Sequence, residues 1–133
     1  MKETRHLESE AQAIKADEAF IAALNAGNNQ VMFEVMHIPH IRISGKGVVI
    51  YNTKEELERE YLNSFAARAG ETWHHTEMDW VQALHSSEDK VHLYLQWTRY
   101  DEDGSALATY PALWIMTKIH GNWGAQCRSS FAP

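Results

Sequence analysis

The sequence predicts an α+β fold in which three N-terminal helices pack in the concave face of a strongly bent, mostly antiparallel sheet, forming a cone-shaped barrel with a pocket at its open end. Helical apolar patterns occupy most of the first 70 residues, with a short strand pattern among them. Four long period-two patterns joined by tight turns occupy residues 73–131. Strands usually have about 5–6 residues, and longer ones suit a sheet that bends around a helix.

Composition and charge limit the classes to which the protein can belong. The 133 residues, 44% of them apolar, are expected to form one globular domain over residues 1–133. The single cysteine, Cys127, excludes an internal disulfide and fits a reducing compartment. The net charge of −6, without any Lys/Arg block, argues against a nucleic-acid partner. Because no apolar run approaches ~20 residues and the charged N-terminus carries no leader pattern, we expect a cytoplasmic protein without a membrane partner.

Two helices are predicted at the start of the chain. The first covers roughly residues 3–26, and its apolar stripe consists of Leu7, Ile14, Phe20, Ile21 and Leu24. Its acidic residues are expected on exposed faces. Gly27 suits the end of this helix, and Asn28 or Asn29 can cap a short second helix. The residues of that helix expected to face the core are Val31, Met32, Val35 and Met36.

A strand is predicted next, over residues 37–44, because apolar Ile41 and Ile43 alternate there with polar residues. Pro39 restricts the start of this strand to an edge or an unpaired position. Glycines at 45 and 47 turn the chain into a short return strand over residues 48–51.

The third helix has the clearest start signal, a capping box formed by Thr53 and Glu56. Its buried face is predicted from apolar residues at i+4 spacing, and Gly70 ends it; these apolar residues are Leu57, Tyr61, Phe65 and Ala69. The four long strands are predicted at residues 73–85, 90–100, 106–119 and 123–131. The loop before the third of them ends in Gly104, which permits the positive φ of a hairpin turn.

This order of elements, ending in a Gly-x-Trp strand, resembles the nuclear transport factor 2-like superfamily, a SnoaL-like or cystatin-like α+β cone, over nearly the whole chain. Particular segments look like a bacterial group within it: residues 37–42, 89–92, 99–100 and 123–131. The resemblance implies a pocket between the sheet and the helices, and a homodimer through the sheet. Relatives include ketosteroid isomerase, scytalone dehydratase and the polyketide cyclases, but their catalytic patterns do not map cleanly onto this chain. It therefore implies no substrate.

Arg128 is the first candidate for a functional residue. Gln126, Arg128 and Ser130 share one face of the last strand, and small or apolar residues share the other. If the polar face lines the pocket, Arg128 is a fixed cation for a carboxylate, an enolate or a phosphate. The alternative is that Arg128 lies on the outer face and is paired with an acid.

Two candidate proton carriers are His40 and Asp79. His40 and Arg42 share the polar side of the strand over residues 37–44, which lies near the pocket in cone folds, so Arg42 is a candidate ligand contact. A neutral imidazole can act as acid or base, but His40 could also be a structural histidine beside Pro39. Asp79 is either a pocket base with a raised pKa or an outer-face residue, and Glu77 of the same parity favours the latter.

The remaining candidates are contacts and walls rather than proton carriers. His75 is a candidate ligand contact, but adjacent His74 points to the other face of the strand, which argues against a metal site there. With no Cys cluster or paired-His helix, we expect no metal and no cofactor, although His40, His75 and Asp79 could meet in three dimensions. Tyr94 could meet Arg128 or lie in a dimer interface. Trp97 and Trp114 are expected in the core and the pocket wall.

Two function classes fit these residues. The first is an enzyme of isomerase, dehydratase or cyclase type that transfers a proton on a small organic, perhaps anionic, substrate, with Arg128 as the electrostatic anchor. The alternative is a non-catalytic dimeric module that holds a small-molecule ligand. An acid and a base facing one cavity would favour the enzyme. A homodimer through the outer sheet face is expected in either case, because that face cannot pack on the helices of its own chain.

Overall fold

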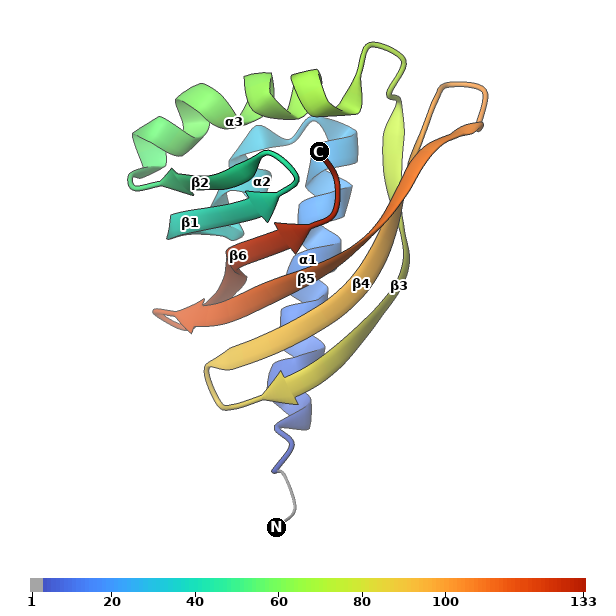
Figure 1. The fold of residues 1–133 in the computed structure, drawn as a ribbon. Helices are drawn as coiled ribbons and strands as arrows, with labels where there is room; N and C mark the ends of the chain where they lie inside the picture. Colours follow the sequence, from blue (N-terminus) through green and yellow to red (C-terminus); the bar gives the residue numbers. More distant parts are fainter. Residues whose placement is uncertain (1–3) are drawn as a thin grey trace.

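The computed structural model describes residues 4–133, which form three helices and a six-stranded mixed sheet that is not closed (Figure 1). The predicted α+β class is confirmed. The helices are α1 (Leu7–Ala26), α2 (Asn29–Glu34) and α3 (Lys54–Ala69). The strands are β1 (Met36–Ser44), β2 (Gly47–Tyr51), β3 (His75–Ser86), β4 (Lys90–Tyr100), β5 (Ala106–Ile119) and β6 (Asn122–Ser130). Within the described part of the chain, no helix is long and apolar enough to cross a membrane.

The sheet has the order β2-β1-β6-β5-β4-β3, and it bends around α1, which runs along its concave side (Figure 1). All neighbouring strands are antiparallel except β1 and β6, which are parallel. α3 lies across the end of the sheet nearest β2.

The helix termini follow the local signals. Gly27 adopts φ 68°, and the Asn28 side chain accepts a hydrogen bond from the Val31 amide. The Thr53 hydroxyl accepts from the Glu56 amide at 3.1 Å, as predicted. α1 begins at Leu7, later than predicted, and residue 3 lies outside the described residues. Leu7 is 71% exposed, so its predicted place in the apolar stripe is wrong: the first turn extends beyond the sheet (Figure 1).

The core face of α1 carries two acids, contrary to the expectation that the helix acids are exposed. Glu10 is buried, and it accepts hydrogen bonds from Arg5 at 2.8 Å and from the Ser86 hydroxyl at 2.6 Å. Asp17 is fully buried beside Ala13 and Phe20 on the same face, and neither of its oxygens has a hydrogen-bond partner among the described residues. A buried polar group without a partner is costly, so Asp17 is an energetic weak point of the fold.

Strand alternation sets the two faces of the sheet, and β-bulges or other register irregularities interrupt it at several places. On β4, Leu93, Leu95 and Trp97 are buried against the helices, while Tyr94 faces outward. A bulge in β3 between Met78 and Trp80 leaves Asp79 unpaired. A second irregularity lies between β5 and β6, next to Gln126. Strands β4 and β5 have the predicted bounds, and Pro39 is unpaired with β6 as predicted.

Candidate functional site

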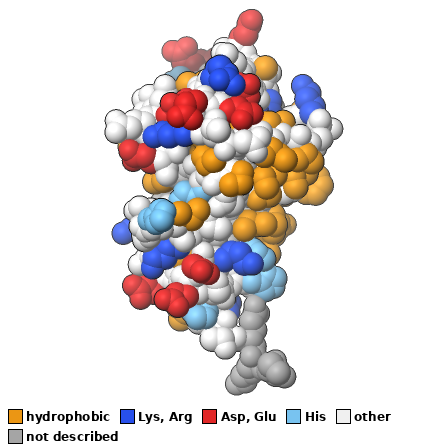
Figure 2. Space-filling view, turned by 90° about the vertical axis from the view of Figure 1, so that its left-hand side faces the viewer, with side chains coloured by type: hydrophobic (Ala, Val, Ile, Leu, Met, Phe, Trp, Pro, Cys, Tyr) orange, Lys and Arg blue, Asp and Glu red, His pale blue; other side chains and the backbone are white. Residues whose placement is uncertain are grey.

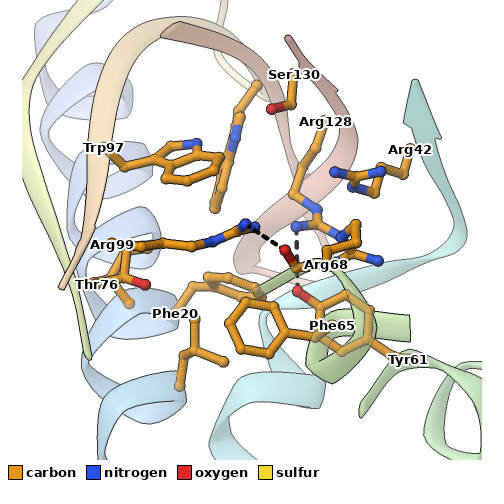
Figure 3. A pocket seen from close by; sticks show the side chains of 13 residues that line it. Phe20, Arg42, Tyr61, Phe65, Arg68, Thr76, Trp97, Arg99, Arg128 and Ser130 are labelled. Atoms are coloured by element: carbon orange, nitrogen blue, oxygen red, sulfur yellow. Dashed lines mark hydrogen bonds between the residues drawn. The ribbon is translucent and has the colours of Figure 1, made fainter. Parts of the chain in front are cut away.

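A pocket lies between α1, α3 and the concave face of the sheet, with a cavity of about 40 Å³. Among residues 4–133, its wall contains four arginines and no aspartate, glutamate or histidine (Figure 3). The full lining is Phe20, Ile21, Leu24, Arg42, Tyr61, Phe65, Arg68, Thr76, Trp97, Arg99, Trp114, Arg128 and Ser130. The site is thus cationic, with aromatic and aliphatic walls.

The four arginines come from four separate elements. Arg42 on β1 and Arg128 on β6 are register partners in the parallel pair of strands, so their side chains emerge side by side. Arg99 follows Trp97 on the inward side of β4, and Arg68 follows Phe65 by one turn on α3. Arg42, Arg99 and Arg128 are each only 6% exposed. Their charges are therefore held largely away from bulk water.

Arg128 is fixed by polar and aromatic contacts. Its Nε donates to His40 Nε2 at 2.9 Å, and its Nη1 donates to the Tyr61 hydroxyl at 3.3 Å. The guanidinium carbon lies 5.4 Å from the Phe20 ring centroid and 5.6 Å from that of Trp114. Nη2 is buried without a partner among the described residues. Arg128 thus has a defined orientation and one free donor group.

His40 holds Arg128 rather than facing the cavity. Because Nε2 accepts from Arg128, the ring proton belongs on Nδ1, which donates to the Ala125 carbonyl at 3.0 Å. Burial lowers the pKa of His40 to about 3, and the neighbouring Arg128 cation contributes to this shift. His40 is therefore neutral at pH 7, and both ring nitrogens are already hydrogen-bonded.

Arg68 and Arg99 meet where α3 lies next to β4. Arg99 Nη1 donates to the Arg68 carbonyl at 3.1 Å, and the Arg99 guanidinium carbon lies 4.6 Å from the Trp97 ring centroid. Arg68 donates through Nη1 to the Ser64 hydroxyl. The Nε groups of Arg68 and Arg99 are buried without partners among the described residues. Three of the four arginines thus present an unpaired buried donor.

The electrostatics of the pocket are set by burial and mutual repulsion. Burial, together with repulsion from the Arg68 and Arg128 cations, lowers the pKa of Arg42 to about 10. Burial is also the main cause of the lowered pKa of Arg68 and of Arg99, to which a neighbouring arginine adds in each case. Guanidinium groups nevertheless stay protonated at pH 7. No carboxylate of the described residues lines the pocket to balance them, although the cost of burying unpaired charge is high.

The structure brings some of the predicted site residues together and leaves others elsewhere. Arg42, Arg128, Trp97 and Trp114 line the pocket, with His40 behind Arg128. Gln126, expected to share the face of Arg128, bonds instead to Pro39 and Thr117, because the bulge beside it breaks the alternation.

Three predicted residues lie away from the pocket. The Asp79 carboxylate accepts from Thr98 at 2.7 Å and from Gln96 at 3.0 Å on the outer face. Tyr94 is 40% exposed there, and His75 stacks on Tyr100. None of the three lines the cavity. Among residues 4–133, no group of three or more His, Cys, Asp and Glu side chains is arranged to hold a metal ion.

The sequence interpretation missed Arg68, Arg99 and the pocket role of Tyr61. For Arg99 a signal was present, because it shares the parity of the apolar residues Leu95 and Trp97 on one strand. For Arg68 the signal was weaker: it lies seven residues after Tyr61 and hence on the same side of the helix. Neither signal indicates that the two side chains meet in space.

Comparison with solved structures identifies the fold. A protein with a cystatin-like fold from Nostoc punctiforme has a TM-score of 0.77 at 14% identity, covering 99% of this chain and 96% of that chain. An NTF2-like protein from Pseudomonas putida has a TM-score of 0.77 at 11% identity, covering 98% and 90%. A ketosteroid isomerase-like protein from Erwinia carotovora has a TM-score of 0.63 at 20% identity, covering 92% and 96%. No family model and no curated protein matches the sequence.

The protein therefore has the nuclear transport factor 2-like fold, as the resemblance implied. At these identities the likeness establishes the fold alone, because one such fold carries many unrelated functions. The chemistry of this chain has to be argued from its own pocket.

Proposed function

We propose that the protein binds a small organic anion in the four-arginine pocket. The observation that carries the proposal is the burial of Arg42, Arg99 and Arg128 beside Arg68 in a wall without a carboxylate. Because unpaired buried charge is expensive, a partner of opposite charge is expected, and the described protein atoms supply none. Guanidinium groups match carboxylate and phosphate oxygens with paired hydrogen bonds.

Replacing Arg128 by Met tests this proposal, with Arg59→Met as the matched control. The Arg59 side chain is exposed on the surface of α3, where it forms an ion pair with Glu60. We expect Arg128→Met to keep or raise the melting temperature of the free protein, because it removes one repelling cation. In wild type, a small carboxylate or phosphate at 100 times its Kd should raise the free energy of unfolding by about 2.7 kcal/mol. The melting temperature should then rise by roughly 10 °C.

The Arg128→Met protein should lose that ligand-induced shift, whereas Arg59→Met should retain it. If the wild-type melting temperature does not respond to any small anion at high concentration, the proposed function is wrong.

A proton-transfer enzyme of isomerase, dehydratase or cyclase type is the second candidate function. The specific observation in its favour is the Tyr61 hydroxyl, which lies in the pocket wall and accepts a hydrogen bond from Arg128. Simple anion binding ranks first, because His40 is engaged with Arg128 and Asp79 lies outside the pocket. Deuterium incorporation from heavy water into a small carbon acid, seen by NMR and lost in Tyr61→Phe, would favour the enzyme.

We also propose a homodimer through the outer face of the sheet. Register pairing places Val48, Ile43, Leu113 and Tyr94 in one row across that face, and Trp80 packs beside Tyr94 at a centroid distance of 4.7 Å. Figure 2, which looks at the side where β2 lies, shows hydrophobic side chains gathered toward one edge. Extended exposed apolar surfaces commonly mark interfaces. Light scattering at micromolar concentration should give about twice the 15.2 kDa of the chain, and the monomer mass would contradict the proposal.

A further inference from the structure

We infer that the ligand of the four-arginine pocket is a small dianion, either a short dicarboxylate or a phosphate-type oxyanion. Arg42 and Arg128 would bind one negative charge, and Arg68 and Arg99 would bind the second. This inference rests on the proposed anion-binding function and adds the charge and size of the ligand to it.

The number of cations argues for more than one negative charge. Arg68 lowers the pKa of both Arg42 and Arg99, and Arg128 lowers the pKa of Arg42 and Arg68, so the four groups act on one another across one cavity. A monoanion would balance one guanidinium and leave three repelling charges in a poorly solvated site. A dianion balances twice as much charge in the same volume, and each added charge pair in a partly buried site is favourable.

The positions of the free donors argue for two binding poles. Arg42 and Arg128 emerge together from the parallel pair β1 and β6. Arg68 and Arg99 are joined through the Arg68 carbonyl at the junction of α3 and β4. Free donors lie in both pairs, Nη2 of Arg128 in the first and Nε of Arg68 and Arg99 in the second. Figure 3 shows these side chains converging on one space from different elements.

The cavity restricts the ligand to a small molecule. About 10–15 Å³ is needed for one water molecule, so a cavity of about 40 Å³ corresponds to about three waters. Phe20, Trp97 and Trp114 close its walls with aromatic rings. A compact molecule whose surface is mostly anionic oxygen fits this combination of volume, charge and aromatic wall.

Three ligands of nearly equal size isolate the effect of charge: malonate is a dianion, malonamate a monoanion and malonamide is neutral. Their affinities for the full-length protein, with inorganic phosphate as a fourth probe, would be measured by titration calorimetry at pH 8 and constant ionic strength. We expect malonate to bind about 10- to 100-fold more tightly than malonamate, because an added charge-assisted hydrogen bond has an effect of that order. Malonamide should not bind. Tighter binding of malonate identifies a dicarboxylate site, and tighter binding of phosphate a phosphate-type site.

Arg68→Met should reduce the ratio of malonate to malonamate affinity, whereas Arg59→Met on the same helix should leave it unchanged. Arg42→Met serves as a second variant if Arg68→Met does not fold. The ratio of malonate to malonamate affinity in the wild-type protein tests the inference even if no variant folds. If malonate and malonamate bind within twofold of each other, and Arg128→Met abolishes both, the dianion inference is overturned while anion binding stands. If none of the anions binds to wild type, the proposed function itself fails.

Discussion

Asp17 should make the protein less stable as the pH rises, and Asp17→Asn should remove that dependence. The Asp17 carboxyl is fully buried on the core face of α1 without a hydrogen-bond partner among the described residues. Burial raises its pKa from the ordinary 3.8 to about 7, and the neighbouring Glu18 charge acts in the same direction. Asparagine keeps the size of the side chain and cannot ionise.

The sign follows from the protons bound by each state. Below pH 3.8 the Asp17 carboxyl is protonated in both the folded and the unfolded chain. Between pH 3.8 and about 7 only the folded chain keeps the proton, so the free energy of unfolding falls as the pH rises. Above about pH 7 both states are ionised and the decrease ends. At about 1.4 kcal/mol per pH unit, the loss is roughly 3 kcal/mol between pH 4.5 and pH 8.5.

The assay is urea unfolding of wild type and Asp17→Asn at intervals from pH 4.5 to pH 8.5. The difference between the two proteins is the informative quantity, because other titrating groups with shifted pKa values, such as His37 and His40, are common to both. From pH 4.5 to pH 8.5, the free energy of unfolding of Asp17→Asn should rise relative to that of wild type by about 3 kcal/mol. Asp103→Asn, at an exposed position, is the matched control. Its free energy of unfolding should change with pH in the same way as that of wild type. If the wild-type and Asp17→Asn curves stay parallel, Asp17 is not buried as a neutral acid and the reasoning fails.

Two further predictions concern His40 and Gly124. His40→Gln retains an acceptor for the pocket arginine and should keep anion binding, whereas His40→Leu should weaken it; equal affinities in calorimetry would show that the imidazole does not position that arginine. Because the folded pKa of His40 lies far below the ordinary 6.5, its contribution to stability is present above pH 6.5 and is lost as the pH falls toward 3, so His40→Gln should unfold at a lower pH than wild type. At Gly124 a Cβ would lie 2.6 Å from His37 Nε2 and 2.9 Å from a backbone carbonyl, so Gly124→Ala should cost about 1–3 kcal/mol in urea unfolding, and an unchanged midpoint would contradict the close packing.

Local signals predicted most of the secondary structure. The alternation in β4 and β5 sets their bounds because each side chain of a strand faces one of two environments, and the turn residues between them act over a few positions. The Thr53 capping box and Gly27 also depend only on neighbouring residues. Such features can be predicted because the interactions that produce them join residues close together in the sequence.

Prediction failed where tertiary packing decided the outcome. The irregularity beside Gln126 is set by the pairing of β5 with β6, and it removes Gln126 from the face that it was expected to share with Arg128. Asp17 is buried because α1 lies against the concave sheet at that turn, whereas Leu7 on the same helix extends beyond it. One-dimensional patterns do not specify where a helix leaves the sheet.

The sequence alone determined the α+β class, the order of its elements and the candidacy of Arg128. Only the tertiary structure placed Arg42, Arg68, Arg99 and Arg128 around one cavity. These residues come from three strands and a helix, and no local periodicity relates residue 42 to residue 128. Strand curvature and the docking of α3 bring them together, because burial of the apolar faces of those elements offsets the repulsion between the cations that they carry.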